Sequence, residues 1–219
     1  MFVGHYAAAF ALKGKEPKAS LGMLFIATQF VDILFFPFVI LGIEHLEFVE
    51  GFTAVNNFKM EYPISHGLLG SVIWALLFYT IYRFGLVRNK LKAKSIALVM
   101  GLAVLSHWFT DLLVHTADLP FIYGEPKFGF GLWNSKWATF GIEALLLSLG
   151  IWYYYKNTKV IKPGGNYLSI AFGLFLLILN YLNFFVLPTN DNINALTFSA
   201  LAAFFILAGI AAWIDRKRG

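Results

Sequence analysis

The sequence contains no cysteine and few charged residues. Any metal site in this chain must therefore be built without thiolates, and cysteine usage carries no information on the redox compartment. Charged residues make up 13% of the 219-residue chain, roughly half of the usual share of about 25% in soluble proteins. Together with 59% hydrophobic residues and a mean hydropathy of +0.69, this excludes a disordered chain and a nucleic-acid-binding domain. The composition favours a polytopic membrane protein.

A second missing feature is a basic stretch before the first apolar residues. The chain begins Met-Phe-Val-Gly-His, so a cleaved signal peptide is not expected. The apolar segment 2–12 is short, and at about 1.5 Å per residue it crosses only part of a hydrocarbon core about 30 Å thick. We therefore expect a half-helix or re-entrant segment there. Six later segments are apolar over about the 20 residues that a membrane-spanning helix needs: 21–43, 64–84, 95–115, 137–155, 167–187 and 195–214.

The basic residues alternate along the chain in a way that predicts its orientation. Of the 17 basic residues, 14 lie before the first span, between the second and third, after the fourth, or at the C-terminus. Because cytoplasmic loops carry the excess of Lys and Arg, the pattern predicts an all-α, multi-pass protein of the cytoplasmic (inner) membrane with both termini cytoplasmic. The 14 residues are Lys13, Lys15, Lys18, Arg83, Arg88, Lys90, Lys92, Lys94, Lys156, Lys159, Lys162, Arg216, Lys217 and Arg218.

The opposite, outer side is predicted to be mostly acidic and to carry two long loops, 44–63 and 116–136. Within the second loop, the glycine-rich stretch 124–131 is expected to form a flexible flap. Trp133 and Trp137 fit an interfacial aromatic belt, with contact to a substrate as the alternative. The acidic residues of this side are Glu44, Glu47, Glu50, Glu61, Asp118, Glu125 and Asp191.

Titratable residues occur inside the predicted spans and the half-helix without any Lys or Arg. A carboxylate in hydrocarbon costs at least a few kcal/mol, so such residues normally face an interior cavity and have a partner. Three acids without a basic side chain are either protonated and hydrogen-bonded to imidazoles, or neutralised by a bound cation. Four imidazoles in the same set favour the cation. The set comprises His5, Asp32, His66, His107, Asp111, His115 and Glu143.

The spacing of these residues predicts that they lie together. His107, Asp111 and His115 are four residues apart, so on a helix they share one face with neighbours about 6 Å apart. Counting from the nearest cytoplasmic basic residue puts most of the set about 20–25 Å above the cytoplasmic face and His5 nearer 12 Å, at about 1.5 Å per residue. We therefore expect one layer in the outer half of the membrane. The last two spans contain no ionisable residue, which favours metal-site helices in 1–155 and two additional structural helices in 156–219 of a single transmembrane domain.

The residues differ in how specifically they indicate a metal. A single membrane histidine is more often a hydrogen-bonded packing residue than a ligand, and this alternative applies to His5 and His115. The pair His107 and Asp111 is a stronger candidate, as is His66 in the sequence Pro-Ile-Ser-His-Gly. All seven titratable residues remain candidate metal ligands.

Nitrogen and oxygen ligands without sulfur suit zinc, with manganese or iron as alternatives, and the set could hold one to three divalent ions. A metal lowers the pKa of its bound water to about 7, so a metal-bound hydroxide would be a nucleophile at neutral pH. Asp32, Asp111 and Glu143 are the candidate catalytic carboxylates. Asp32 has no evident structural role in mid-span, whereas Glu143 lacks a ligand partner four residues away.

The order His5, Asp32, His66 and then His107-xxx-Asp111 resembles the membrane-bound metal-dependent hydrolase family over about residues 1–145. That family is distantly similar to zinc-dependent phospholipase C and to the single-strand-specific zinc nucleases. The resemblance implies that His5 helps Asp111 to hold one metal beside another. It implies that the other metal is held by Asp32, His66, His107 and Asp111.

The sequence departs from the pattern of the soluble relatives at its last motif, which is His-xxx-Glu. Four residues before Glu143 stands Thr139 rather than His, and His115 is the candidate for the missing imidazole. The number of metals therefore stays open. The last two spans lie outside the resemblance.

The leading hypothesis is a metal-dependent phosphoester hydrolase acting on a lipid or lipid-linked substrate, because a site in the outer half of the membrane is open to lipid from the side and to water from outside. A zinc-dependent amide or acyl hydrolase, ceramidase-like, is the alternative enzyme, and the absence of Arg and Lys near the cluster weighs slightly toward it. A metal-ion or proton transporter would use the same residue types but at several depths, whereas the predicted layer is single. The expected partners are such a substrate and the membrane, not nucleic acid.

Overall fold

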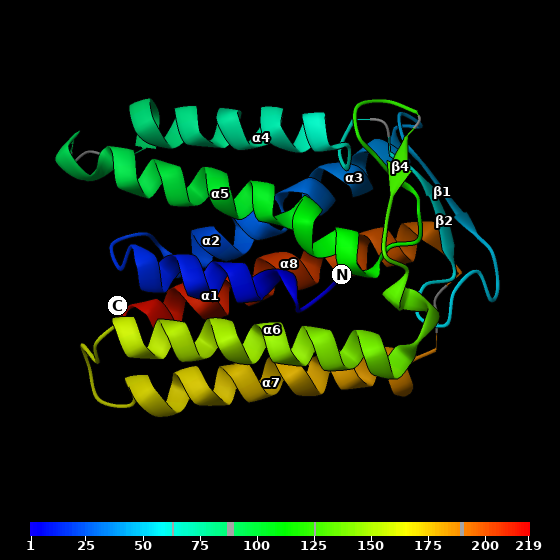
Figure 1. Ribbon diagram of the computed structural model, residues 1–219. Coiled ribbons are helices and arrows are strands. Elements are labelled where there is room, and N and C mark those ends of the chain that lie inside the picture. The colour runs from blue at the N-terminus through cyan, green and yellow to red at the C-terminus, as the bar shows by residue number, and fades with distance from the viewer. Residues whose placement is uncertain (63, 87–89, 125, 189–190) are drawn as a thin grey trace.

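The computed structural model describes residues 1–62, 64–86, 90–124, 126–188 and 191–219. Arg88 and Glu125, which belong to the predicted charge pattern, lie outside the described residues. The described part of the chain is mostly helical, and two short antiparallel hairpins lie together at one end of the helices (Figure 1).

Each of the apolar segments singled out in the sequence is helical. The half-helix expected at 2–12 is α1, which continues as far as Lys15, and the last two predicted spans are α7 and α8. The α-helices of the described residues are α1 (His5–Lys15), α2 (Leu21–Thr28), α3 (Phe30–Ile40), α4 (Leu68–Ile81), α5 (Lys90–Val114), α6 (Lys136–Asn157), α7 (Gly165–Phe185) and α8 (Ile193–Asp215).

Four of these helices, α4, α5, α7 and α8, lie in stretches long and apolar enough to cross a membrane. The bent pair α2 and α3 adds a fifth candidate, whereas α6, with 22 residues, is not among them. Large apolar side chains such as Leu76, Leu174 and Phe205 are exposed on these helices. Exposed apolar surface of this extent is compatible with a multi-pass membrane protein, in which lipid covers it. The structure thus supports four or five spans where the sequence predicted six.

The first predicted span is broken. α2 ends at Thr28, α3 begins two residues later, and the two helices are bent by 49°. The carbonyl oxygen of Thr28 accepts a hydrogen bond from Nδ1 of His107 at 2.8 Å, and Gln29 Nε2 donates to the carbonyl of Phe2 at 3.2 Å. The break also puts Asp32 in the first turn of α3, where the helix dipole stabilises a carboxylate. A single continuous helix would not place this carboxylate at a helix N-terminus.

The predicted outer loops contain short paired strands. β1 and β2 form a hairpin within 44–63, and β3 pairs with β4 in the second loop. The stretch 124–131, expected to be a flexible flap, therefore contains a paired strand. A Cβ at Gly129 would clash with the carbonyl oxygen of Thr116, so this glycine permits a close backbone approach. The strands are β1 (His45–Phe48), β2 (Phe58–Glu61), β3 (Leu119–Pro120) and β4 (Lys127–Phe128).

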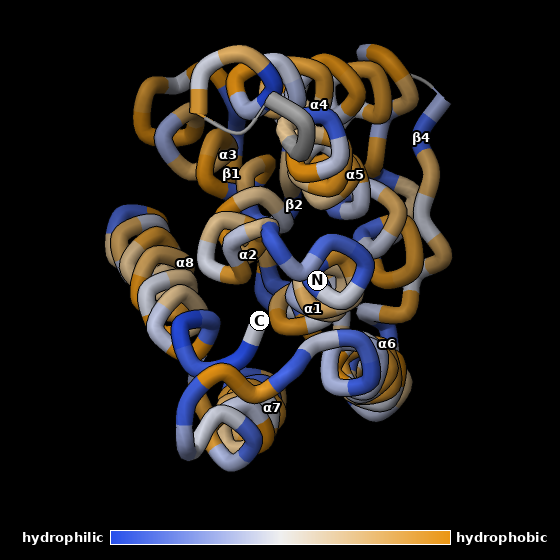
Figure 2. Tube along the Cα trace, turned by 90° about the vertical axis from the view of Figure 1, so that its left-hand side faces the viewer, coloured by the Kyte–Doolittle hydropathy of each residue, from blue (hydrophilic) through white to orange (hydrophobic). Residues whose placement is uncertain are grey.

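The short helix α1 lies at the centre of the helices. Seen from the end opposite the hairpins, it is surrounded by α2, α5 and α6, and hydrophilic residues gather in the loops of this near end (Figure 2). The rings of Tyr6 and Phe10 pack on Phe25 of α2, with centroids 4.2 and 5.4 Å away, and Phe10 also packs on Tyr154 of α6. These buried aromatic contacts fix α1, and therefore His5 at its first position, inside the bundle.

The two ends of the chain lie at different depths. The amino group of Met1 lies in the interior, 2.5 Å from Asp111 Oδ1. The far end of α1 lies beside the C-terminal residues, where Lys13 forms an ion pair with Asp215 at 2.6 Å. The expectation that both termini lie on one side of the spans therefore does not describe Met1. The reason is length, because an 11-residue helix of about 16 Å reaches only part of the way through the bundle.

Candidate metal centre

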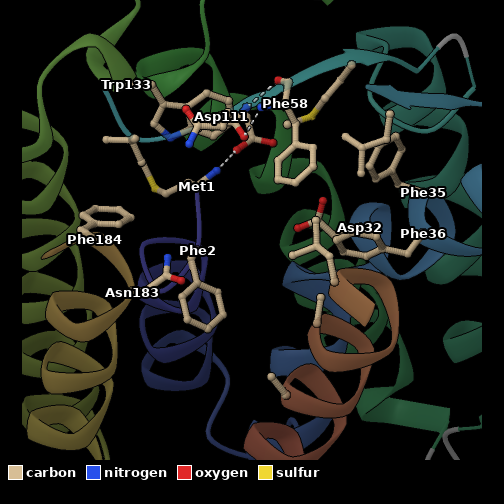
Figure 3. Close-up of a pocket in the computed structure, with 18 of the residues that line it drawn as sticks. Met1, Phe2, Asp32, Phe35, Phe36, Phe58, Asp111, Trp133, Asn183 and Phe184 are labelled. Carbon is tan, nitrogen blue, oxygen red and sulfur yellow. Dashed lines mark hydrogen bonds and ion pairs between the residues drawn. The ribbon is translucent and has the colours of Figure 1, made fainter. Parts of the chain in front are cut away.

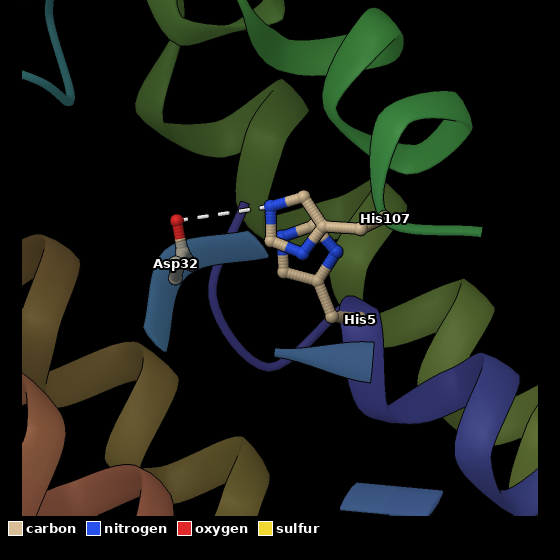
Figure 4. Close-up of side chains that lie close together, drawn as sticks. All are labelled: His5, Asp32 and His107. Atoms are coloured by element: carbon tan, nitrogen blue, oxygen red, sulfur yellow. Dashed lines mark ion pairs between the residues drawn. The ribbon is translucent and has the colours of Figure 1, made fainter. Parts of the chain in front are cut away.

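Five of the seven predicted ligands lie together in the interior of the bundle. They come from the first residue of α1, the first turn of α3, the loop just before α4 and successive turns of α5. Figure 4 shows His5 and His107 side by side with Asp32 next to them. In the described part of the chain, two groups of three residues each bring ligand atoms within 4.8 Å of one another. These groups are His5, Asp32 and His107, and His66, His107 and Asp111.

The separations between the ligand atoms fit a metal ion. Two ligands of a tetrahedral zinc, each about 2.0–2.1 Å from the metal, lie about 3.4 Å apart. Asp111 Oδ2 lies 3.0 Å from His107 Nε2 and 3.9 Å from His66 Nε2. Asp32 Oδ1 lies 3.2 Å from His66 Nε2 and 3.7 Å from His107 Nε2. His5 Nε2 lies 3.2 Å from Asp111 Oδ1. These values lie on both sides of the expected separation, so small side-chain movements suffice for coordination.

The rings of His107 and His5 are each held by their Nδ1 atoms. His107 Nδ1 lies 2.8 Å from the carbonyl oxygen of Thr28, which can only accept, so Nδ1 carries a proton. His5 Nδ1 lies 2.7 Å from Thr110 Oγ1, whose own proton is donated to the carbonyl of Ser106 or His107. The two rings are stacked, with centroids 3.9 Å apart and planes 8° from parallel. Both leave Nε2 facing the carboxylates, as a metal-binding imidazole does.

His66 is held in the same way by a longer chain of hydrogen bonds. Its Nδ1 lies 2.7 Å from Ser65 Oγ, and this hydroxyl donates to Glu44 Oε2 at 2.7 Å. The other carboxylate oxygen of Glu44 accepts from the amides of Ile64 and Ser65 at 2.9 and 2.8 Å. Glu44 is buried. A carboxylate that orients a histidine from behind is the usual partner of a metal ligand.

His115 takes an outer position. Its Nε2 lies 3.7 Å from Asp111 Oδ1, and the residue belongs to neither three-residue group. Its Nδ1 lies 3.0 Å from Asp118 Oδ1 and 3.1 Å from the hydroxyl of Tyr62. Burial, with a further contribution from Asp118, raises the pKa of Tyr62 well above its ordinary value, so the hydroxyl stays protonated. The ring is packed on Trp133, with centroids 4.0 Å apart. His115 is therefore oriented like the other imidazoles but lies farther from the centre.

Two buried nitrogen atoms at the centre, Nε2 of His5 and Nε2 of His107, have no partner in hydrogen-bond geometry, although each lies close to an oxygen of Asp111, at 3.2 and 3.0 Å. Buried polar atoms nearly always have one, so these two atoms require an explanation. In the described residues, the carboxylates of Asp32 and Asp111 form no ion pair with Lys or Arg; their cationic partners are imidazoles and the amino group of Met1. A divalent cation between these nitrogen atoms and the carboxylates would bind both and compensate the carboxylate charge. The residues present therefore fit a metal.

Glu143 lies next to the centre but has another partner. It is completely buried on α6 and accepts a hydrogen bond from the amide of Gly4 at 2.9 Å, with longer ones from the amide of Phe2 at 3.4 Å. It belongs to neither three-residue ligand group. Thr139, one turn earlier, donates to the carbonyl of Leu132 at 2.6 Å. Glu143 therefore anchors the segment that carries His5, and its role as ligand or catalytic group stays a prediction.

A cavity of about 510 Å³ opens onto the centre (Figure 3). This volume lies within the range of about 300–1,000 Å³ that is usual for small-molecule sites. The ionisable side chains that line it are those of Asp32, His66, Asp111, His115 and Glu143. Figure 3 shows aromatic side chains on the remaining walls, among them Phe2, Phe35, Phe36, Phe58 and Phe184. The cavity therefore combines a charged floor with largely apolar sides.

The last two helices line this cavity, although the sequence favoured a purely structural role for them. α7 contributes Phe184 and neighbouring residues, and α8 contributes Ala203 and neighbouring residues. Trp133 also lines the cavity and is 7% exposed, so it does not belong to an outward-facing belt. Trp137, by contrast, is 68% exposed. The role of α7 and α8 in lining the cavity could not be predicted from the sequence, because apolar residues that line a cavity and apolar residues that face lipid have the same composition.

Sequence reasoning missed the residues that orient the imidazoles. Glu44 and Asp118 were interpreted only as outer-side charges, and Ser65 was not considered. The adjacent pair Ser65 and His66 was the one usable signal, because a hydroxyl next to a candidate ligand can hold its ring. Thr28 acts through its backbone carbonyl, which no side-chain pattern reveals.

No family model matches the sequence, and neither a curated protein nor a solved structure is similar to the chain. The resemblance to membrane-bound metal-dependent hydrolases therefore depends on the order of five residues. The interpretation of the centre depends on its own geometry.

Proposed function

We propose that the protein is a membrane-embedded, metal-dependent hydrolase that cleaves a phosphoester of a lipid or lipid-linked substrate. The observation that carries this proposal is the orientation of four imidazoles. Each is held at Nδ1 by a different oxygen atom, and each directs Nε2 towards Asp32, Asp111 or both. One packing histidine needs no such arrangement, whereas a metal centre needs it for every imidazole.

In this proposal the chain crosses the inner membrane six times. The spans are α4, α5, α7, α8, the bent pair α2 and α3, and α6. α6 is included because its 22 residues, about 33 Å long, pack between α1 and α7. The basic residues near the C-terminal end favour a cytoplasmic position for that end, and in this proposal the hairpins therefore face outward. The centre then lies in the outer half of the membrane, within reach of both lipid and external water.

The ligand set suits a single divalent ion, most simply zinc. The two three-residue groups share Nε2 of His107, and one imidazole nitrogen coordinates one ion, so the groups describe one site rather than two. When bound, zinc would lower the pKa of a coordinated water and offset the negative charge of a phosphoester.

The two carboxylates of the centre have different tasks in this proposal. The side chain of Asp32 is 20% exposed, against 2% for Asp111, and both line the cavity. Asp32 is held through Oδ1 by His66 at 3.2 Å and remains accessible to a water in the cavity, so it is placed to accept the proton of that water. Asp111 is enclosed by the imidazoles and the amino group of Met1 and keeps the ligands in position.

A second candidate function is the hydrolysis of an amide or ester bond of a lipid. The observation that favours it is that the described lining of the cavity contains no Lys or Arg to bind a phosphate. A carbonyl substrate would need no such group, because the metal alone can polarise it. Both candidates use the same centre and the same proton acceptor.

The test combines metal analysis with lipid turnover on the purified full chain. Wild-type protein is expected to contain about one divalent ion per chain and to release a head group or phosphate from one or more classes of phospholipid. His107→Ala is expected to lose both the ion and the turnover. His45→Ala is the matched control, because His45 is exposed on β1 and lies outside both three-residue groups.

The outcomes separate the two candidates. Release of fatty acid from N-acyl or ester lipids, without release of phosphate or head group, would replace the first proposal with the second. A wild-type protein without metal, or a His107→Ala variant with unchanged metal content and turnover, would refute both.

A further inference from the structure

The cavity continues from the metal centre along one face of α8. The lining residues of this helix are spaced three or four positions apart, which puts them in a single stripe. Over eight positions the stripe is about 12 Å long. Its central residues are small, so the helix leaves room beside it, and an aromatic ring ends it. The stripe consists of Leu196, Ser199, Ala200, Ala203 and Phe204.

α7 forms the opposite wall. Its lining residues also follow the helical repeat, and Phe36 of α3 contributes a further aromatic side chain beside α8. Figure 3 shows Phe184 and Asn183 on one side of the cavity and Phe36 on the other. The residues on this side are Leu179, Asn183 and Phe184 of α7 and Leu187, two residues beyond its end. We call the space between these residues and the α8 stripe the α7–α8 groove.

The chemistry of the groove differs from that of the floor. None of the described lining residues that α7 and α8 contribute is ionisable, and most are apolar. A charged or strongly polar ligand would therefore lose its hydration there without gaining partners. Both helices are candidate membrane spans, so the molecules that surround them are lipids. The groove and the centre share one cavity, which Asp32 and Asp111 also line.

We propose that the α7–α8 groove binds one hydrocarbon chain of a membrane lipid and thereby positions the head-group end of that lipid at the metal centre. The identity of this lipid as the substrate rests on the proposed hydrolase function; the binding of the chain does not. The small residues Ala200 and Ala203 decide how far a chain reaches along α8. Selectivity is therefore for the length of the chain, whereas the floor selects the bond that is cleaved.

The test fills the groove with a side chain. Ala203→Trp introduces an indole into the groove, and Ala202→Trp introduces the same indole on the adjacent, exposed position of α8. With a long-chain substrate, Ala203→Trp is expected to lower kcat/KM at least tenfold, while a short-chain analogue with the same head group is cleaved within twofold of the wild-type rate. Ala202→Trp is expected to match wild type on both substrates. Equal loss on both substrates by Ala203→Trp, with metal content retained, would overturn the assignment.

A second measurement decides the proposal even if the protein cleaves no lipid. Wild-type chain is reconstituted in vesicles of phosphatidylethanolamine and phosphatidylglycerol that contain a phosphatidylethanolamine with a diazirine in one acyl chain. Light is expected to label Phe36, Phe184 or Phe204 in the groove of the wild type and of Ala202→Trp, and to leave them unlabelled in Ala203→Trp. If Ala203→Trp does not fold, as judged by metal content and a monodisperse elution profile, Ala203→Leu takes its place. Labelling confined to exterior residues such as Phe198 and Phe205 would refute the proposal, as would cross-links between two copies of the chain within the groove.

Discussion

The two ends of α1 lie in two buried charged networks that are built differently. At the far end, Lys13 is buried and contacts Asp215 at 2.6 Å and the carbonyl oxygens of Pro17 and Ala19 at 2.6 and 2.9 Å. At the first residue, Nε2 of His5 lies 3.2 Å from Asp111 Oδ1, an oxygen that also contacts the amino group of Met1. In the first network, which is complete, a lysine and backbone groups partner one carboxylate. In the second, which is incomplete, two carboxylates share the imidazoles and the amino group of Met1, with no Lys or Arg among the described residues.

Arg218 shows how complete the far network is. Its guanidinium donates to the hydroxyl and carbonyl of Thr158, to Asn166 Oδ1 and to the carbonyl of Tyr155. It also lies 3.8 Å from the centroid of the Tyr155 ring. The side chains and backbone around Arg218 provide these partners, so this network needs no ligand. It holds the C-terminal residues against the end of α6.

The difference between the two networks indicates which of them has a role beyond stability. Buried charge is costly in both networks, but only the complete one is explained by stability. In our proposal the incomplete one, with oriented imidazoles and two carboxylates, binds a cation that comes from outside the chain. Variants in the two networks should therefore separate metal binding from folding, and this separation can be measured.

The largest effect is expected for Asp111→Asn. Asp111 lies within 3.0 to 3.9 Å of Nε2 of His107, His5, His115 and His66, so it holds the incomplete network together. Loss of a residue behind a ligand typically lowers metal affinity about 10- to 100-fold, so we expect more than about 100-fold for this one. Competition titration with a chromophoric chelator measures the affinity. Asp191→Asn, at an exposed position just before α8, is the control. Unchanged zinc affinity in Asp111→Asn would remove the basis of the metal centre.

The second largest effect is expected in the complete network, and on stability alone. Lys13→Met leaves Asp215 without its cation, which typically costs about 3–5 kcal/mol for a buried pair. Because the side chain of Asp215 is 16% exposed, we expect about 3 kcal/mol. Thermal unfolding in detergent measures this loss, and zinc affinity should stay within a factor of about 2. Lys15→Met, at an exposed position, is the control. If Lys13→Met reduced zinc affinity as strongly as Asp111→Asn, the two networks would not be independent.

A smaller effect is expected for Glu44→Gln, which weakens the support of His66. The amide keeps the size of the carboxylate but removes its charge, so the bond from Ser65 becomes weaker and His66 is less firmly oriented. We expect zinc affinity to fall about 10- to 100-fold with little change in unfolding temperature. Glu47→Gln, exposed on β1, is the matched control. An effect on unfolding without one on affinity would assign Glu44 to the hairpin and not to the centre.

The sequence predicted the positions of the helices well because each lies largely within an apolar segment. It predicted the buried His, Asp and Glu side chains of these segments, but it missed the burial of Lys13, Glu44 and Arg218, because these residues lie outside the predicted spans. It did not predict the break before Asp32. The stretch Ala-Thr-Gln-Phe contains no helix breaker, and the only proline of the region, Pro37, lies inside α3. The break depends on contacts of Thr28 and Gln29 with distant residues.

The candidate site was predictable as a set of residues but not as a set of roles. Glu143 and His66 are both buried titratable residues near the ends of spans, and the sequence ranked them by type and spacing alone. The structure turns Glu143 to the amides of Phe2 and Gly4 and turns His66 to Asp32. Such orientations depend on backbone groups, which carry the same atoms at every position and leave no pattern in the sequence.

The smallest effect is expected for His115→Ala. This variant tests whether His115 belongs to the ligands of the incomplete network. His115 shares a helix face with His107 and Asp111, so its sequence position alone predicts an equal role. Its Nε2 is nevertheless 3.7 Å from Asp111 and outside both ligand groups, and its Nδ1 is held by Asp118. We therefore expect zinc affinity to fall less than about tenfold, below the range for residues that directly orient a ligand, while turnover falls more because the ring lines the cavity. A loss of zinc as large as that of Asp111→Asn would make His115 a ligand and extend the centre along α5 by one turn.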